Sequence, residues 1–214
     1  MKYIALAAFV IFTSVHLYAS HIKNQKWRNY TKPFILITLT AYYLSASNDI
    51  RMTIILALFF SWLGDVLLMP KGVKWFTVGG ISFMVSHVFF ILGYWVDIDP
   101  VNVSWPVMIG MEVFFFILVA IIFSRLKQYL PKALVAPMFL YLFINGTMNC
   151  FAILRMMSNP CTATITTCIG AVLFFISDTS LFFVRFNKDS RLKTHFIVML
   201  TYSIGELLIV LGLV

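Results

Sequence analysis

Four acidic residues interrupt long apolar stretches of the chain, where a charge is costly. They are Asp65, Glu112, Asp178 and Glu206, half of the eight Asp and Glu residues. An ionised carboxylate at the centre of a membrane helix costs on the order of 3 kcal/mol, so such groups are expected to face one another, to face water or to be protonated. A carboxylic acid beside a carboxylate can perform acid/base catalysis, and buried acids also serve as proton relays.

Two of these acids, Asp65 and Asp178, are expected to lie at the same depth. Asp65 is about one helical turn from the end of the apolar stretch 52–69, and Asp178 is about two turns from the end of the stretch 162–186. Both stretches are expected to run in the same direction. Lys32 and His87 belong near the same end, so we expect a polar pocket built around two aspartates.

Further polar residues in the apolar stretches could line this pocket. Three pairs spaced i, i+4 each project from one helix face: Asn145 with Asn149, Ser61 with Asp65, and Tyr202 with Glu206. Polar side chains also join membrane helices through hydrogen bonds worth about 1 kcal/mol each, so a structural role is an open alternative for these residues. Glu112 is expected nearer the opposite surface, where it could simply seal a helix contact.

The elements that must position these residues are membrane helices. Of the 214 residues, 61% are hydrophobic and only 11% are charged, whereas an ordinary soluble domain has about 25% charged residues. A membrane core of about 30 Å requires about 20 residues per helix. Apolar runs predict eight helices at 3–20, 33–47, 52–69, 76–96, 106–124, 133–154, 162–186 and 194–214. This pattern predicts an all-α polytopic bundle forming one domain over 1–214, with Pro33 in the first turn of its helix.

The distribution of basic residues predicts an orientation for the eight helices. Three basic residues, Lys2, Arg51 and Arg155, lie on one side of the predicted bundle. The other 13 of the 16 lie in alternate loops on the opposite side: Lys23, Lys26, Arg28, Lys32, Lys71, Lys74, Arg125, Lys127, Lys132, Arg185, Lys188, Arg191 and Lys193. Since Lys and Arg accumulate in cytoplasmic loops, both termini are expected on the non-cytoplasmic side.

Charge and cysteine content argue against several other classes of protein. The net charge of +8 is explained by loops beside lipid headgroups, so we expect membrane lipids as partners and no nucleic acid. Cys150, Cys161 and Cys168 have neither the even count of a disulfide framework nor the spacing of a C-x-x-C zinc motif. The first apolar stretch lacks a small-residue cleavage site and is expected to remain as a helix.

Six segments resemble the lysoplasmalogenase family, also called the YhhN family. They are Thr31-Lys32-Pro33, Ser61 to Met69, Phe83 to His87, Tyr141 with Met148, Gly170 to Asp178, and Tyr202 to Ile209. The resemblance covers essentially the whole chain. The most specific elements are the G-D-x-L-L sequence that includes Asp65 and the G-A-x-x-F-x-x-S-D sequence that ends at Asp178. One departure is Glu206, where Gln is expected in much of the family.

The resemblance implies hydrolysis of the vinyl-ether bond of lysoplasmalogens, which are lysophospholipids. The products would be a fatty aldehyde and glycerophosphocholine or glycerophosphoethanolamine. Protonation of the β carbon of a vinyl ether gives an oxocarbenium ion, which water traps as a hemiacetal. A carboxyl group in a low-dielectric site can stay protonated near neutral pH, while a second carboxylate stabilises the cation or activates water.

Roles for individual residues follow from combining this chemistry with the predicted pocket. We expect Asp65 and Asp178 to be the catalytic pair, His87 to orient one of them or a water, and Lys32 to lie near the substrate phosphate. The other candidate substrate-binding residues are Ser61, Tyr141, Asn145, Asn149, Ser177, Tyr202 and Glu206. The scheme requires no metal and no cofactor. The host membrane would be a bacterial cell membrane or the endoplasmic reticulum.

Three alternatives use similar residues. A proton-coupled transporter would employ the buried acids as a relay, although no inverted repeat or recurring helix break is evident. A zinc amidohydrolase would need several converging His ligands, and only His87 is clearly inside a span. An intramembrane aspartyl protease carries a G-x-G-D signature, in which Trp62 replaces the first glycine here.

Overall fold

The computed structural model describes residues 1–99, 101–187 and 195–214. All regular structure in these ranges is helical. The helices are α1 (Lys2–His21), α2 (Gln25–Ala46), α3 (Met52–Leu67), α4 (Val73–Trp95), α5 (Trp105–Leu126), η1 (Lys127–Tyr129), η2 (Lys132–Leu134), α6 (Val135–Ser158), α7 (Thr162–Phe186) and α8 (His195–Leu211). The predicted all-α class is confirmed. The loop residues Lys188, Asp189, Arg191 and Lys193 lie outside the described ranges.

Five of the described helices are long and apolar enough to cross a membrane. They are α1, α4, α5 with the following 3-10 turn, α6 and α7, while α3 and α8 are shorter apolar helices. The second helix, α2, begins with a polar segment that contains Lys26, Arg28 and Lys32. These properties indicate a protein embedded in a membrane.

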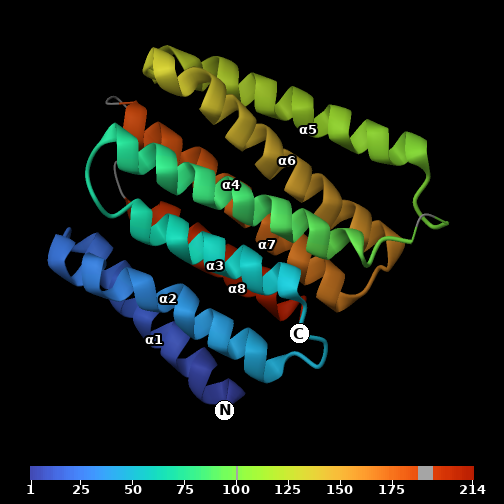
Figure 1. Cartoon of the computed structure of the whole chain (residues 1–214), viewed down its shortest axis with the longest axis horizontal. Helices are drawn as coiled ribbons and strands as arrows, with labels where there is room; N and C mark the ends of the chain where they lie inside the picture. The colour runs from blue at the N-terminus through green and yellow to red at the C-terminus, as the bar shows by residue number, and fades with distance from the viewer. Residues whose placement is uncertain (100, 188–194) are drawn as a thin grey trace.

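The helices lie side by side with alternating direction (Figure 1). In the closest pairs, α1 packs on α2, α3 on α4, and α7 on α8, whereas α5 reaches the bundle mainly through α6. The connections α1–α2, α3–α4 and α5–α6 lie at one end, which we call the basic end because these segments carry Lys23, Lys71 and Lys127. Both chain termini lie at the other end, which we call the far end.

The prediction for the second helix was wrong at its start. Helix α2 begins at Gln25, so Pro33 lies inside the helix and not in its first turn. Asn24 caps the helix by accepting a hydrogen bond from the Trp27 amide at 3.3 Å. The carbonyl of Pro33 accepts a hydrogen bond from Trp62 Nε1 at 3.1 Å, which fixes α2 against α3 and places neighbouring Lys32 in the bundle.

Helices α7 and α8 approach closely because each has a glycine at their contact. A Cβ on Gly170 would lie 2.7 Å from the carbonyl oxygen of Gly205, and a Cβ on Gly205 would lie 2.9 Å from the carbonyl oxygen of Gly170. Small residues at such crossings let membrane helices pack backbone against backbone. This contact brings Asp178 on α7 and Tyr202 on α8 to one cavity.

Candidate active site

A cavity of about 100 Å³ at the basic end contains both predicted catalytic aspartates. Asp65 comes from α3 and Asp178 from α7, and Lys32 and Tyr202 line the same cavity from α2 and α8. We call it the two-aspartate cavity. Asp65 and Asp178, which the sequence predicted at a common depth, therefore line the same cavity.

Asp65 is held by a cation and a phenol. Its Oδ1 lies 3.1 Å from the Lys32 amine, and its Oδ2 accepts a hydrogen bond of 2.8 Å from the Tyr202 hydroxyl. The residue is only 3% exposed. An opposite charge at this distance favours the ionised form of a carboxyl group and so opposes the effect of burial on Asp65.

The partners of Asp178 differ from those of Asp65, because they are uncharged hydrogen-bond donors and a histidine. The Tyr141 hydroxyl and the Asn145 amide, one turn apart on α6, both donate to its Oδ2, the latter at 2.8 Å. His87 Nε2 lies 3.6 Å from the same oxygen. Within the described residues, no Lys or Arg pairs with Asp178 and no hydrogen bond involves its Oδ1, so this oxygen is available to carry and deliver a proton.

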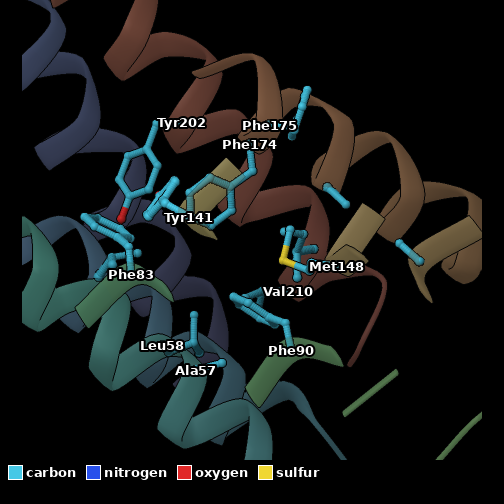
Figure 2. Packing of buried hydrophobic residues seen from close by; sticks show 14 of the residues in the cluster. Ala57, Leu58, Phe83, Phe90, Tyr141, Met148, Phe174, Phe175, Tyr202 and Val210 are labelled. Atoms are coloured by element: carbon cyan, nitrogen blue, oxygen red, sulfur yellow. The ribbon is translucent and has the colours of Figure 1, made fainter. Parts of the chain in front are cut away.

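Four aromatic rings pack together beside the two aspartates and are called the aromatic wall; of these, Phe83 and Tyr202 line the two-aspartate cavity. Figure 2 shows Phe83, Tyr202, Phe174 and Tyr141 gathered at this wall. The ring centroids of Phe83 and Tyr202 lie 6.0 Å apart, and those of Phe174 and Tyr202 lie 5.3 Å apart. Gly64 allows the approach of Phe83, because a Cβ there would lie 2.5 Å from that ring. The wall lowers the local dielectric and strengthens the electrostatic interactions beside it.

The fully buried His87 side chain contacts this wall. Its ring lies 5.0 Å from that of Phe174 and 5.4 Å from that of Tyr141, measured between centroids. Among the described residues, neither ring nitrogen has a hydrogen-bond partner. The Nε2 atom therefore lies near Asp178 without being committed to another group in the described chain.

Four other predicted site residues lie outside the immediate surroundings of the aspartates or point elsewhere. Ser61 shares a hydrogen bond of 2.8 Å with Ser86, and Ser177 donates to the Val198 carbonyl at 2.8 Å, so both join helices. Asn149 donates to Asn145 and thereby supports it from behind. Glu206 is fully buried near Ser61, with no well-formed hydrogen bond to either carboxyl oxygen in the described chain.

Two arginines and a histidine at the mouth of the two-aspartate cavity were missed as site residues. Arg28, Arg185 and His195 line the mouth together with Lys32. Their spacing in the sequence could have predicted this position. Arg28 precedes Lys32 by four residues, Arg185 follows Asp178 by seven, and His195 precedes Tyr202 by seven. These intervals are one and two helical turns, so each of the three residues shares a helix face with a known cavity residue.

A separate ionic cluster lies at the far end. Asp97 pairs with Arg51 at 2.8 Å and with Arg155 at 2.7 Å, and Arg155 also donates to the Thr167 hydroxyl and the Gly212 carbonyl. Helix α6 continues to Ser158, beyond the predicted end at residue 154, and Arg155 is buried in its last turn. The cluster ties α6, α7 and the C-terminal segment together.

The remaining acid, Glu112, does not belong to the two-aspartate cavity. It is half-buried on α5 and accepts a hydrogen bond of 2.6 Å from Thr147 on α6. In the described ranges, no group of three or more His, Cys, Asp and Glu side chains is placed to hold a metal ion. Among the described residues, the titratable groups in direct contact with the two aspartates are Lys32, His87, Tyr141 and Tyr202.

Comparison with known families gives one match that covers nearly the whole chain. Residues 27–213 match the model of the YhhN family. This range includes every residue that lines the two-aspartate cavity. Neither the curated proteins nor the solved structures include a match.

Proposed function

The chain belongs to the YhhN family, which includes lysoplasmalogenases, and we propose that it is a membrane hydrolase that cleaves the vinyl-ether bond of lysoplasmalogens. Water and the lysolipid would give a fatty aldehyde and glycerophosphocholine or glycerophosphoethanolamine. The observation that carries this proposal is the contrast between the two aspartates. Asp65 is paired with a cation, and Asp178 accepts hydrogen bonds from neutral donors in the same cavity.

In the first chemical step, Asp178 transfers its proton to the β carbon of the vinyl ether. The electron pair of the double bond forms the new C–H bond, and the positive charge is shared by the α carbon and the ether oxygen. The Asp65 carboxylate and the faces of the nearby aromatic rings stabilise this oxocarbenium ion. Lys32 keeps Asp65 ionised for this purpose, and Tyr141 and Asn145 stabilise the carboxylate that forms on Asp178.

Water then completes the reaction. It attacks the α carbon while Asp65 accepts its proton, which gives a hemiacetal. The hemiacetal hydroxyl returns a proton to Asp178 as the carbonyl bond forms, and Asp65 donates its proton to the departing glycerol oxygen. Both aspartates thus regain their starting protonation states. One acts as the acid and the other as the base, as two carboxyl groups do in the hydrolysis of glycosidic bonds.

The mouth of the cavity suits the phosphate of such a substrate. Arg28, Arg185 and His195 lie there, and Arg28 Nε is buried without a hydrogen-bond partner in the described chain. Guanidinium groups bind phosphate through paired hydrogen bonds. Because Lys32 is committed to Asp65, we assign the phosphate to these three residues and give Lys32 the role of holding the carboxylate.

For the whole chain, we propose eight membrane crossings in one domain, with the basic end on the cytoplasmic side. The shorter apolar helices α3 and α8 and the apolar part of α2 would add to the five long spans. Lys and Arg concentrate in the basic-end connections, as expected of cytoplasmic loops. The substrate would therefore enter from the cytoplasmic leaflet.

The test is aldehyde release from an alkenyl lysophospholipid by the detergent-purified protein. Asp65→Asn and Asp178→Asn should fold and lose activity, whereas Glu112→Gln, a matched change of an acid outside the cavity, should remain active. An alkyl-ether lysophospholipid should not be cleaved. If the folded protein releases no aldehyde from either headgroup class, the hydrolase proposal fails. The hypothesis to test next is then proton-coupled transport, measured in sealed vesicles.

A further inference from the structure

An apolar groove lies beside the two-aspartate cavity, between α4 and α6. It has a volume of about 350 Å³, within the range of small-molecule binding sites. Its walls include Phe76, Gly80, Met84, Met138, Tyr141 and Phe182, and no Asp, Glu, Lys or Arg of the described chain lines it. Ile81 and Leu140 line it as well and are about half exposed, so the groove opens onto the outer surface of the bundle.

The groove and the two-aspartate cavity share walls. Phe76 lines both of them. Tyr141 presents its ring to the groove and donates its hydroxyl hydrogen to Asp178. Phe182 packs on both rings, with centroids 5.2 Å from Tyr141 and 6.2 Å from Phe76. A molecule that extends from one space to the other would pass these three rings and reach Asp178.

We propose that the groove between α4 and α6 binds the hydrocarbon chain of the lysophospholipid, and that Gly80 sets the chain length it accepts. This inference rests on the proposed function. The described lining of the groove is uncharged, whereas Arg28 and Arg185 line the neighbouring two-aspartate cavity, so an amphiphile with an anionic headgroup fits in one orientation. Its phosphate lies at Arg28 and Arg185, and its vinyl ether lies beside Asp178.

Gly80 is a point in the groove where an added side chain would enter open space. A Cβ built on Gly80 has no heavy atom within 4 Å. By contrast, a Cβ on its neighbour Gly79 would lie 2.9 Å from Leu68, where α3 and α4 pack together. A leucine at position 80 would therefore fill the groove and leave the helix packing unchanged.

The first experiment compares substrates that differ only in chain length. In Gly80→Leu, kcat/KM for a hexadecenyl lysophospholipid should fall at least about tenfold relative to an octenyl one, because apolar pockets discriminate by about that factor per methylene group. The matched control is Gly110→Leu on α5, where a Cβ also meets no atom within 4 Å but lies outside the groove. If both folded variants retain the wild-type chain-length profile, the assignment of the chain to this groove is overturned.

A second experiment does not depend on hydrolysis. An uncleavable alkyl-ether lysophospholipid with a diazirine at the end of its chain should cross-link to Ile81 or Met84 of the wild type, and this labelling should drop in Gly80→Leu. Labelling spread over the outer helix faces, equal in both proteins, would show adventitious lipid only and overturn the proposal. Groove labelling in a protein that releases no aldehyde would retain the chain site and reject the hydrolase function.

Discussion

The Lys32 amine and the Asp65 carboxylate lie 3.1 Å apart across the contact of α2 and α3, with their side chains 16% and 4% exposed. This ion pair distinguishes Asp65 from Asp178, which has no such cation in the described chain. A buried pair of this kind contributes little net stability, but removing one partner leaves an uncompensated charge. The pair therefore favours Asp65 over Asp178 as the anion.

Lys32→Met is expected to abolish most of the activity and to destabilise the fold by about 3 kcal/mol, because Asp65 would be left buried without its cation. Aldehyde release and the thermal unfolding midpoint in detergent measure the two effects. The double variant Lys32→Met with Asp65→Asn should recover the midpoint and remain inactive. Lys26→Met, which changes an exposed residue of the same helix, is the control. Full activity in folded Lys32→Met would contradict the role given to the pair.

The cations at the mouth of the two-aspartate cavity should affect binding more than chemistry. Arg28→Gln and Arg185→Gln are each expected to raise KM about tenfold for a phosphate-bearing substrate, since a hydrogen bond to a charged group contributes about 1.5–3 kcal/mol. Their kcat should change little. Arg185 also lies over the Phe76 ring, 5.7 Å from its centroid, which orients it toward the cavity.

A neutral alkenyl glycerol without phosphate separates this effect from a general loss of fold. Its KM should be the same in the wild type, Arg28→Gln and Arg185→Gln. Arg125→Gln, an exposed change at the basic end, should leave both substrates unaffected. An equal rise in KM for the charged and the neutral substrate would remove these arginines from phosphate recognition.

The ionic cluster at the far end is expected to stabilise the fold without contributing to catalysis. Arg155→Met removes the partner of Asp97, Thr167 and the Gly212 carbonyl, and the free energy of unfolding should fall by about 3 kcal/mol. Thermal unfolding in detergent measures this loss. The kcat of the folded fraction should match the wild type, and a specific loss of kcat would show that the far end is coupled to the reaction.

The apolar runs predicted most of the fold because membrane helices must be apolar along their length. Seven predicted helices agree with the structure to within a few residues. The second did not, since its first two turns carry Lys26, Arg28 and Lys32 and have no apolar signal. A helix that extends beyond the apolar layer needs no hydrophobic residues there, and only the Asn24 cap marked its true start.

The two aspartates and their depth could be predicted, but their partners could not. A buried charge is conspicuous in an apolar sequence. The sequence does not state how each helix is rotated about its axis, and that rotation decides that Tyr202 binds Asp65 while Tyr141 binds Asp178. Ser177 illustrates the same point, because it is adjacent to Asp178 yet donates its hydrogen bond to α8.

The proposed orientation can be tested with the native Cys161. This residue is exposed at the start of α7, at the far end, whereas Cys150 is buried and Cys168 is partly buried. Hydrogen bonds from the backbone and side chain of Thr164 lower the pKa of the Cys161 thiol. A lower pKa gives more thiolate at any pH below the usual value for cysteine, so maleimide labelling should already be rapid near neutral pH.

If the far end is non-cytoplasmic, a membrane-impermeant maleimide should label Cys161 in intact cells or right-side-out vesicles. Cys161→Ser should abolish this labelling. In that background, Lys127→Cys at the basic end should react only after the membrane is opened. The reverse pattern would place the basic end outside, and the substrate would then have to enter from the non-cytoplasmic leaflet. Because the site lies close to the basic end, this measurement decides which lipid leaflet supplies the enzyme.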